Sequence, residues 1–161
     1  MSFHVRRTDK EITDPVIMKK ILKSAQYVTL ALSMDNQPYL VSLNYGYDEN
    51  HNCIYYHCAK EGKKLVYIKS NNTVWGQVVL DHGYAEGKCT HLYASVHFSG
   101  KVTFLDSFEE KRVAMECMMQ QLDKNPEPLK ARLSPNRLNS IVTCRIDIDH
   151  MSGKKSPEIT I

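Results

Sequence analysis

The stretch from Tyr39 to Asn71 constrains the fold more than any other part of this 161-residue chain. Side chains alternate between two faces from Tyr39 to Tyr47, with the period of two that is typical of a strand with one packed face. A polar segment of turn-forming residues follows, and Cys53–Cys58 resumes as a second strand-like run. The pattern predicts an antiparallel hairpin in which one face of the first strand is small and polar.

A glycine followed by two lysines, Gly62-Lys63-Lys64, comes after this hairpin and opens a short predicted helix. The N–H groups at the start of a helix are exposed and carry partial positive charge, and two ammonium groups add to it. Such a position favours a dianion, for example a phosphate monoester. The turn is not a GxxxxGK[ST] motif, so a solvated basic turn is the alternative interpretation.

The rest of the chain has the composition of a small barrel with helices over its ends. Asp14-Pro15 provides an N-cap and a first-position proline for a helix that ends near Ser24. Ser107 and Glu110 form a capping box for a helix that ends at Asp123. We therefore predict a mainly β chain of the α+β type. Six strands are expected, at 27–33, 39–47, 53–58, 73–80, 92–105 and 141–148.

Other segments are expected to be irregular. They comprise an extended arm, a polar loop, a loose helical turn and a surface tail, at 2–11, 81–90, 129–138 and 150–161. Two glycines fall inside predicted strands. Gly76 predicts a bulge or a close backbone approach, and Gly100 predicts a bend as the sheet curls.

Composition limits the class of protein. With 42% hydrophobic and 24% charged residues, the chain fits a single domain that spans 1–161. The 21 basic and 18 acidic residues are scattered, so we expect no nucleic-acid partner. No apolar run approaches the roughly 20 residues that span a bilayer, and the N-terminus lacks the apolar centre of a signal peptide. We expect a cytoplasmic protein without a membrane partner.

The chemistry-bearing residues are dispersed. The five cysteines include no CxxC pair and are expected to be free thiols. A zinc site from His82, Cys89 and His91 would lack a fourth ligand, so no metal is expected. The chain also lacks a GxSxG elbow and a paired-carboxylate pattern. If the protein is an enzyme, a bound cofactor supplies the difficult chemistry.

Four segments resemble the flavin-binding split-barrel superfamily of pyridoxamine phosphate oxidase, in the branch that contains the 5-nitroimidazole resistance proteins. They are YLVSLNYGYD, IYYHCAKEGKKLVYIKSN, YASVHFSGKV and the late strand that leads to HMSGKK. The similarity runs from about Arg6 to Lys155. It implies a six-stranded antiparallel split barrel with flanking helices, a homodimer, and FMN in the cleft between the subunits. The chain departs from the family pattern at Ser42 and Ala94, where proline and a basic residue are frequent.

The resemblance and the basic turn together predict the flavin site. The phosphate is expected at Gly62, Lys63, Lys64 and Ser95, and the isoalloxazine ring along Val41–Asn44. Without the resemblance, Ser95 would be interpreted as an ordinary outward-facing strand residue. The expected cofactor-binding residues are Val41, Ser42, Leu43, Asn44, Tyr56, His57, Ala59, Gly62, Lys63, Lys64, Ser95 and Val96.

His57 is the candidate catalytic residue. Just before the basic turn, its imidazole could hydrogen-bond the phosphate or ribityl chain, or approach a substrate on the flavin ring. A structural imidazole bonded to a backbone carbonyl is the alternative. The resembling branch implies reduction of nitroimidazole-like or other electron-poor molecules, with NAD(P)H as donor. A pyridoxamine phosphate oxidase and a non-catalytic carrier of flavin or haem are the other two hypotheses.

Overall fold

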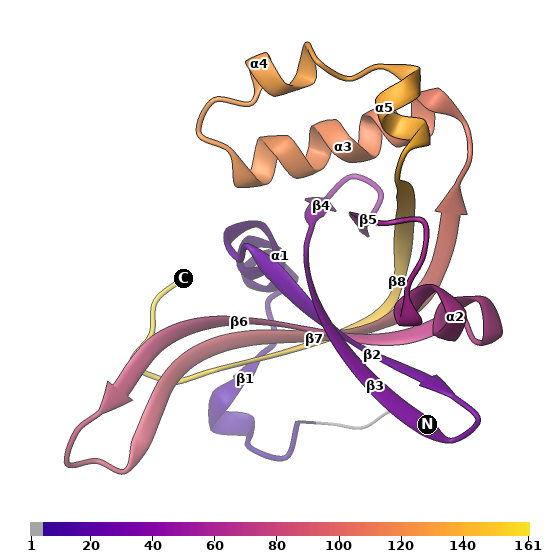
Figure 1. Cartoon of the computed structure of the whole chain (residues 1–161). Helices are drawn as coiled ribbons and strands as arrows, with labels where there is room; N and C mark the ends of the chain where they lie inside the picture. Colours follow the sequence, from indigo (N-terminus) through magenta and orange to yellow (C-terminus); the bar gives the residue numbers. More distant parts are fainter. Residues whose placement is uncertain (1–4) are drawn as a thin grey trace.

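The computed structural model describes residues 5–161 and shows one strongly curved antiparallel sheet with helices packed around it (Figure 1). The strand order is β3-β2-β6-β7-β8-β5-β4, and β1 pairs with β8 beside this path. The two outermost strands do not pair, so the sheet is not closed. This is a split barrel, which confirms the predicted fold class.

The strands and helices have the following bounds. The strands are β1 Glu11–Ile12, β2 Tyr27–Met34, β3 Gln37–Asn44, β4 Gly46–Asp48, β5 Cys53–Cys58, β6 Thr73–Ala85, β7 Thr90–Leu105 and β8 Val142–Lys155. The helices are the 3-10 turn η1 Thr8–Lys10, α1 Pro15–Ser24, α2 Lys63–Ser70, α3 Phe108–Leu122, α4 Glu127–Lys130 and α5 Pro135–Asn139.

All six predicted strands are present, but the run at 39–47 divides at Tyr45 into β3 and β4. Only β4 forms the predicted hairpin with β5, where Gly46 pairs with Tyr55. The prediction was wrong for β3, which pairs with β2 along its whole length. At Tyr45 the chain passes from one part of the sheet to another. The Tyr45 side chain is completely buried there, and its hydroxyl donates to the carbonyl of Leu22.

The turn between β2 and β3 explains this pairing. Asp35 and Asn36 both have positive φ, 49° and 60°. Two consecutive residues with positive φ make the tight hairpin turn whose twist suits antiparallel strands. A two-residue turn therefore places β3 directly beside β2.

Strands β6 and β8 extend well beyond their predicted ends. Strand β6 continues to Ala85, so most of the predicted loop at 81–90 is a β hairpin that projects from the barrel (Figure 1). Strand β8 continues to Lys155 and pairs there with β7, so the prediction of a surface tail from 150 was wrong. Gly153 is buried and closely packed, and a Cβ there would lie 2.9 Å from Cβ of Ile12. Ser156, just beyond β8, is also buried.

The helix predictions are mostly confirmed. The Asp14 side chain accepts from the Val16 N–H at the start of α1, and Ser107 and Glu110 form the capping box of α3. The loose turn at 129–138 is instead the two short helices α4 and α5. The arm at 2–11 is not extended throughout, because it contains η1 and the start of β1; its residues 2–4 lie outside the described part.

Two cores hold the molecule together. The larger core joins the inner face of the sheet to α1 and to Tyr67 and Ile68 of α2. The smaller core lies under α3, where Ala114 and Met118 pack against Tyr55 and Leu105. Helix α3 therefore covers the outer side of β5 and the end of β7. No helix among residues 5–161 is long and apolar enough to cross a membrane.

Candidate functional site

Strand β3 divides the expected ring-binding residues between its two faces. Ser42 and Asn44 face outward and are exposed, whereas Val41 and Leu43 are half-buried and pack against the larger core. The hydroxyls of Ser42 and Thr29 are 3.0 Å apart, and the Asn44 amide donates to a backbone carbonyl. At Ser42 and Asn44 the outer face of β3 is thus small and polar, as the alternation predicted, whereas the exposed side chain of Leu40 makes it apolar further along the strand.

The predicted phosphate seat is a helix start without a side-chain cap. Gly62 precedes α2 with a φ of 143°, a conformation that favours glycine. No atom lies within 4 Å of the position that a Cβ would take there. The Leu65 N–H donates to the Gly62 carbonyl, and because no side chain caps α2, the N–H groups of Lys63 and Lys64 are left for a ligand.

Lys63 connects this helix start to β3. Its Nζ lies 4.6 Å from the centre of the Tyr39 ring and 5.4 Å from the centre of the Tyr67 ring. Tyr39 belongs to β3 and Tyr67 to α2. The structure therefore brings the basic turn against the strand that was expected to carry the flavin ring.

Lys64 has different neighbours. It is half-buried, and its charge opposes the rise in pKa of the Cys58 and Cys144 thiols. Burial is nevertheless the larger cause at both thiols and raises the pKa of Cys144 to about 12. These thiols are therefore protonated and poorly nucleophilic at neutral pH.

His57 is an exposed residue of β5, opposite Thr143 of β8. Loss of hydration lowers the pKa of its imidazole, and no charged or hydrogen-bonding neighbour contributes to that shift. The ring is therefore neutral at pH 7 and can either donate or accept a hydrogen bond.

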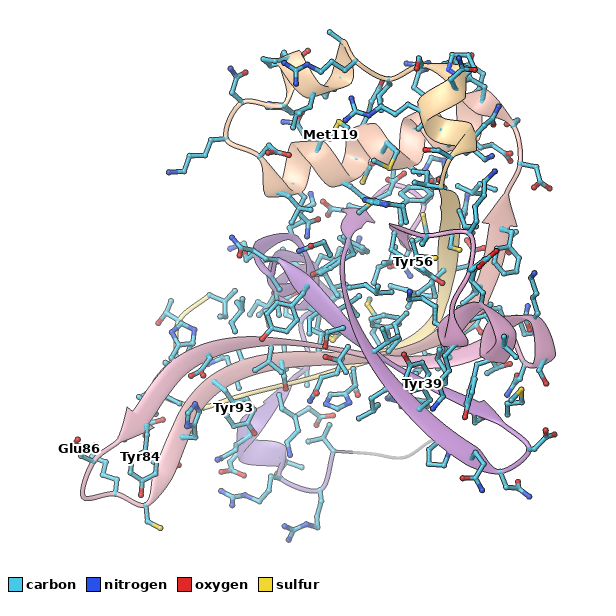
Figure 2. The ribbon with its side chains drawn as sticks, viewed as in Figure 1. Tyr39, Tyr56, Tyr84, Glu86, Tyr93 and Met119 are labelled. Carbon is cyan, nitrogen blue, oxygen red and sulfur yellow. The ribbon has the colours of Figure 1, made fainter. Side chains whose placement is uncertain are left out.

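The residues on either side of His57 are placed differently. Ala59 is exposed near the basic turn. The side chain of Tyr56 is completely buried in the larger core, and its hydroxyl has no partner among the described residues (Figure 2). The side chain of Tyr56 thus faces away from any surface ligand.

Ser95 and Val96 lie on β7, which is separated from β3 by β2 and β6. Three strand spacings correspond to about 14 Å. The Val96 side chain is fully buried, and Ser95 is 4% exposed and donates to the carbonyl of Lys154. Within one chain, the structure does not bring these two residues next to β3.

Three residues were missed by the sequence reasoning. Tyr39 contacts Lys63, and the Gln77 amide nitrogen lies 3.0 Å from Nε2 of His97 on the outer face of β6 and β7. Burial first, and then the charge of Lys154, lower the pKa of His97. The period of two from Ser95 would have placed His97 on the same face, but nothing in the sequence indicated the partner strand.

A separate hollow of about 460 Å³ lies between α2 and the end of β7. Lys60, Lys69 and Lys111 line it together with apolar residues such as Leu65. It adjoins the basic turn but does not include Gly62, Lys63 or Lys64. Among residues 5–161, no group of three histidine, cysteine or acidic side chains could hold a metal ion.

A family model described as pyridoxamine 5'-phosphate oxidase matches residues 17–155. The chain belongs to the pyridoxamine 5'-phosphate oxidase family. The match covers every strand from β2 to β8, and so includes both β3 and the basic turn.

Solved structures agree with this assignment. A candidate 5-nitroimidazole antibiotic resistance protein from Bacteroides thetaiotaomicron is 26% identical with a TM-score of 0.77, over 89% of this chain and 85% of that one. An FAD and haem binding protein from Mycobacterium smegmatis is 16% identical with a TM-score of 0.77, over 91% of this chain and 73% of that one. The flavocytochrome Anf3 from Azotobacter vinelandii is 16% identical with a TM-score of 0.79, over 95% of this chain and 72% of that one. The proteins from Mycobacterium smegmatis and Azotobacter vinelandii share the fold of this chain. No curated protein sequence matches it.

Proposed function

We propose that this protein binds FMN, with the phosphate at Gly62–Lys64 and the ring system along the outer face of β3. The observation that carries the proposal is the contact of Lys63 with Tyr39, which sets an uncapped helix start beside β3, an edge strand of the sheet. The space beside Gly62 is open, so the chain itself does not obstruct a phosphate there. Three structural neighbours are described as binding FAD, and this supports a flavin as the cofactor class.

The residues of the chain have distinct roles in this proposal. The first N–H groups of α2 and the ammonium groups of Lys63 and Lys64 hold the phosphate dianion. Ser42 and Asn44 leave room for a planar ring, and the exposed side chain of Leu40 gives that ring an apolar contact. Bound flavin supplies the redox chemistry. The neutral His57 provides a hydrogen bond near the basic turn.

A second copy of the chain completes the site in this proposal. Strand pairing places four exposed apolar side chains on the outer face of β3, β2 and β6: Tyr27, Leu40, Trp75 and Val79. Exposed apolar patches of this kind are typical of protein interfaces. Across such an interface, the part of β7 around Ser95 of one subunit would approach the flavin that is held mainly by the other.

The proposed activity is reduction of a nitroimidazole or another electron-poor small molecule with NAD(P)H as donor. It is supported by the 26% identity to the candidate 5-nitroimidazole resistance protein.

An oxidase of pyridoxamine phosphate would need a second phosphate site. Three arginines that could form one are already paired with carboxylates: Arg7, Arg112 and Arg145.

The phosphate seat is tested by changing Lys63 and Lys64 together to alanine. We expect FMN affinity to fall by more than tenfold while riboflavin affinity is unchanged, because only FMN carries the phosphate. Fluorescence quenching of each flavin measures both constants. Changing Lys19 and Lys20 to alanine is the control, since it removes the same charge from α1. An equal loss for both flavins would refute the assigned seat.

The spectrum of the purified protein separates the remaining hypotheses. Flavin absorption supports the proposal, whereas a Soret band indicates a haem carrier. NADH oxidation coupled to loss of a nitroimidazole distinguishes a reductase from a flavin carrier. Protein that stays colourless when it is mixed with excess FMN would exclude a flavin function.

A further inference from the structure

Two tyrosines hold the ammonium group of Lys63. Tyr39 and Tyr67 come from different elements, and their ring centres are 5.3 Å apart with planes inclined by 54°. The Lys63 Nζ is within 6 Å of both centres, at 4.6 Å and 5.4 Å, which is the range of a cation–π contact.

Each ring is itself held in place. Tyr67 is almost fully buried and lies four residues after Lys63, on the same side of α2. Tyr39 is half-buried, packs against the larger core and projects from β3, as Figure 2 shows. The ammonium group is thus restrained between the helix and the strand, although a lysine side chain on its own has four flexible carbon–carbon bonds.

We propose that Tyr39 is a positioning residue, which holds the Lys63 ammonium at the start of α2 and thereby gives the site its preference for phosphorylated over unphosphorylated flavin. This inference rests on the proposed FMN function. Holding the charge in place before binding removes part of the ordering cost of the complex. The benefit applies only to a ligand that carries an anion at this point, so riboflavin does not receive it.

A matched pair of substitutions tests the inference in the full chain. Tyr39→Leu removes the aromatic face but keeps apolar volume, whereas Tyr39→Phe keeps the face. We expect Tyr39→Leu to weaken FMN binding roughly two- to fivefold and to leave riboflavin binding unchanged. Tyr39→Phe should match the wild type. Tyr84→Leu, at the far tip of the β6–β7 hairpin, is the control for loss of an exposed tyrosine (Figure 2).

A double-mutant cycle shows whether Tyr39 acts through Lys63. In the Lys63→Ala background, Tyr39→Leu should have no further effect on either flavin. An additional loss of FMN affinity there would overturn the inference, as would an equal loss of riboflavin affinity in the single variant. Loss in Tyr39→Phe would assign the effect to the hydroxyl and also overturn it.

A measurement on the unmodified protein covers the case in which Tyr39→Leu does not fold. The ring faces should shift the Lys63 Hε proton resonances upfield, and the absence of that shift would overturn the inference. The two proposals also fail differently. If the wild type binds FMN and riboflavin equally, the phosphate seat is wrong. If it prefers FMN and Tyr39→Leu keeps the full preference, only the role of Tyr39 is wrong.

Discussion

At the scale of single residues, His57 shows how environment sets chemistry. Its pKa lies below the ordinary value because the protein removes part of its hydration, and no carboxylate counteracts this. The neutral imidazole is therefore the main form at pH 7. A phosphate dianion beside it would favour the protonated form and raise its pKa.

We predict that FMN raises the pKa of His57 and that riboflavin does not. The titration of the His57 Hε1 resonance with and without each flavin measures this. His57→Ala should fold normally and retain FMN less well, while His51→Ala should behave as the wild type, because His51 is exposed on the β4–β5 turn and pairs with Asp48. If FMN leaves the His57 titration unchanged and His57→Ala retains FMN fully, the imidazole is only structural.

At the scale of elements, β6 and β7 are joined by a contact that only glycine permits. A Cβ on Gly76 would lie 2.1 Å from Cζ of Phe98, a buried ring on the paired strand. The sequence predicted a bulge or a close backbone approach at this glycine. The close approach exists, and its partner is a side chain.

We predict that Gly76→Ala destabilises the protein by about 1–3 kcal/mol, because the added methyl group overpacks the core. Urea unfolding followed by circular dichroism measures the loss. The double variant Gly76→Ala with Phe98→Leu should be more stable than Gly76→Ala alone, since the smaller side chain makes room. An unaltered unfolding midpoint in Gly76→Ala would show that the sheet adjusts without strain.

Elements also show where sequence reasoning succeeds. Helices α1 and α3 were predicted correctly because Asp14, Ser107 and Glu110 cap backbone groups within three residues of themselves. Strand β8 was cut short at 148 because its last residues, apart from Met151, are polar or glycine. They form a strand only because β7 supplies partners such as Val96 for Gly153.

At the scale of the whole molecule, the outer face of β3, β2 and β6 carries exposed apolar side chains. Trp75 is 47% exposed and Leu40 65% exposed, and β2 lies between their strands. Helix α3 covers the outer side of β5 but leaves this part of the sheet free. The proposed homodimer would bury this surface and bring the part of β7 around Ser95 to the flavin of the other subunit.

We predict that Trp75→Glu converts the dimer into a monomer and lowers FMN affinity at least tenfold, because a buried unpaired charge is costly. Sedimentation velocity and flavin titration measure the two effects. Val113→Glu places the same charge on an exposed apolar position of α3 and should leave both unchanged. A wild-type chain that sediments as a monomer and still binds FMN would contradict the proposed assembly.

The sequence by itself determined the local features of this protein: the six strand runs, the caps of α1 and α3, and a glycine–lysine turn that opens α2. These depend on residues within a few positions of each other. Only the tertiary structure decided that Lys63 lies against Tyr39 and that β2 and β6 separate Ser95 from β3. These relations join residues that are far apart in the sequence. They depend on how the strands are arranged in the sheet, so no local sequence pattern encodes them.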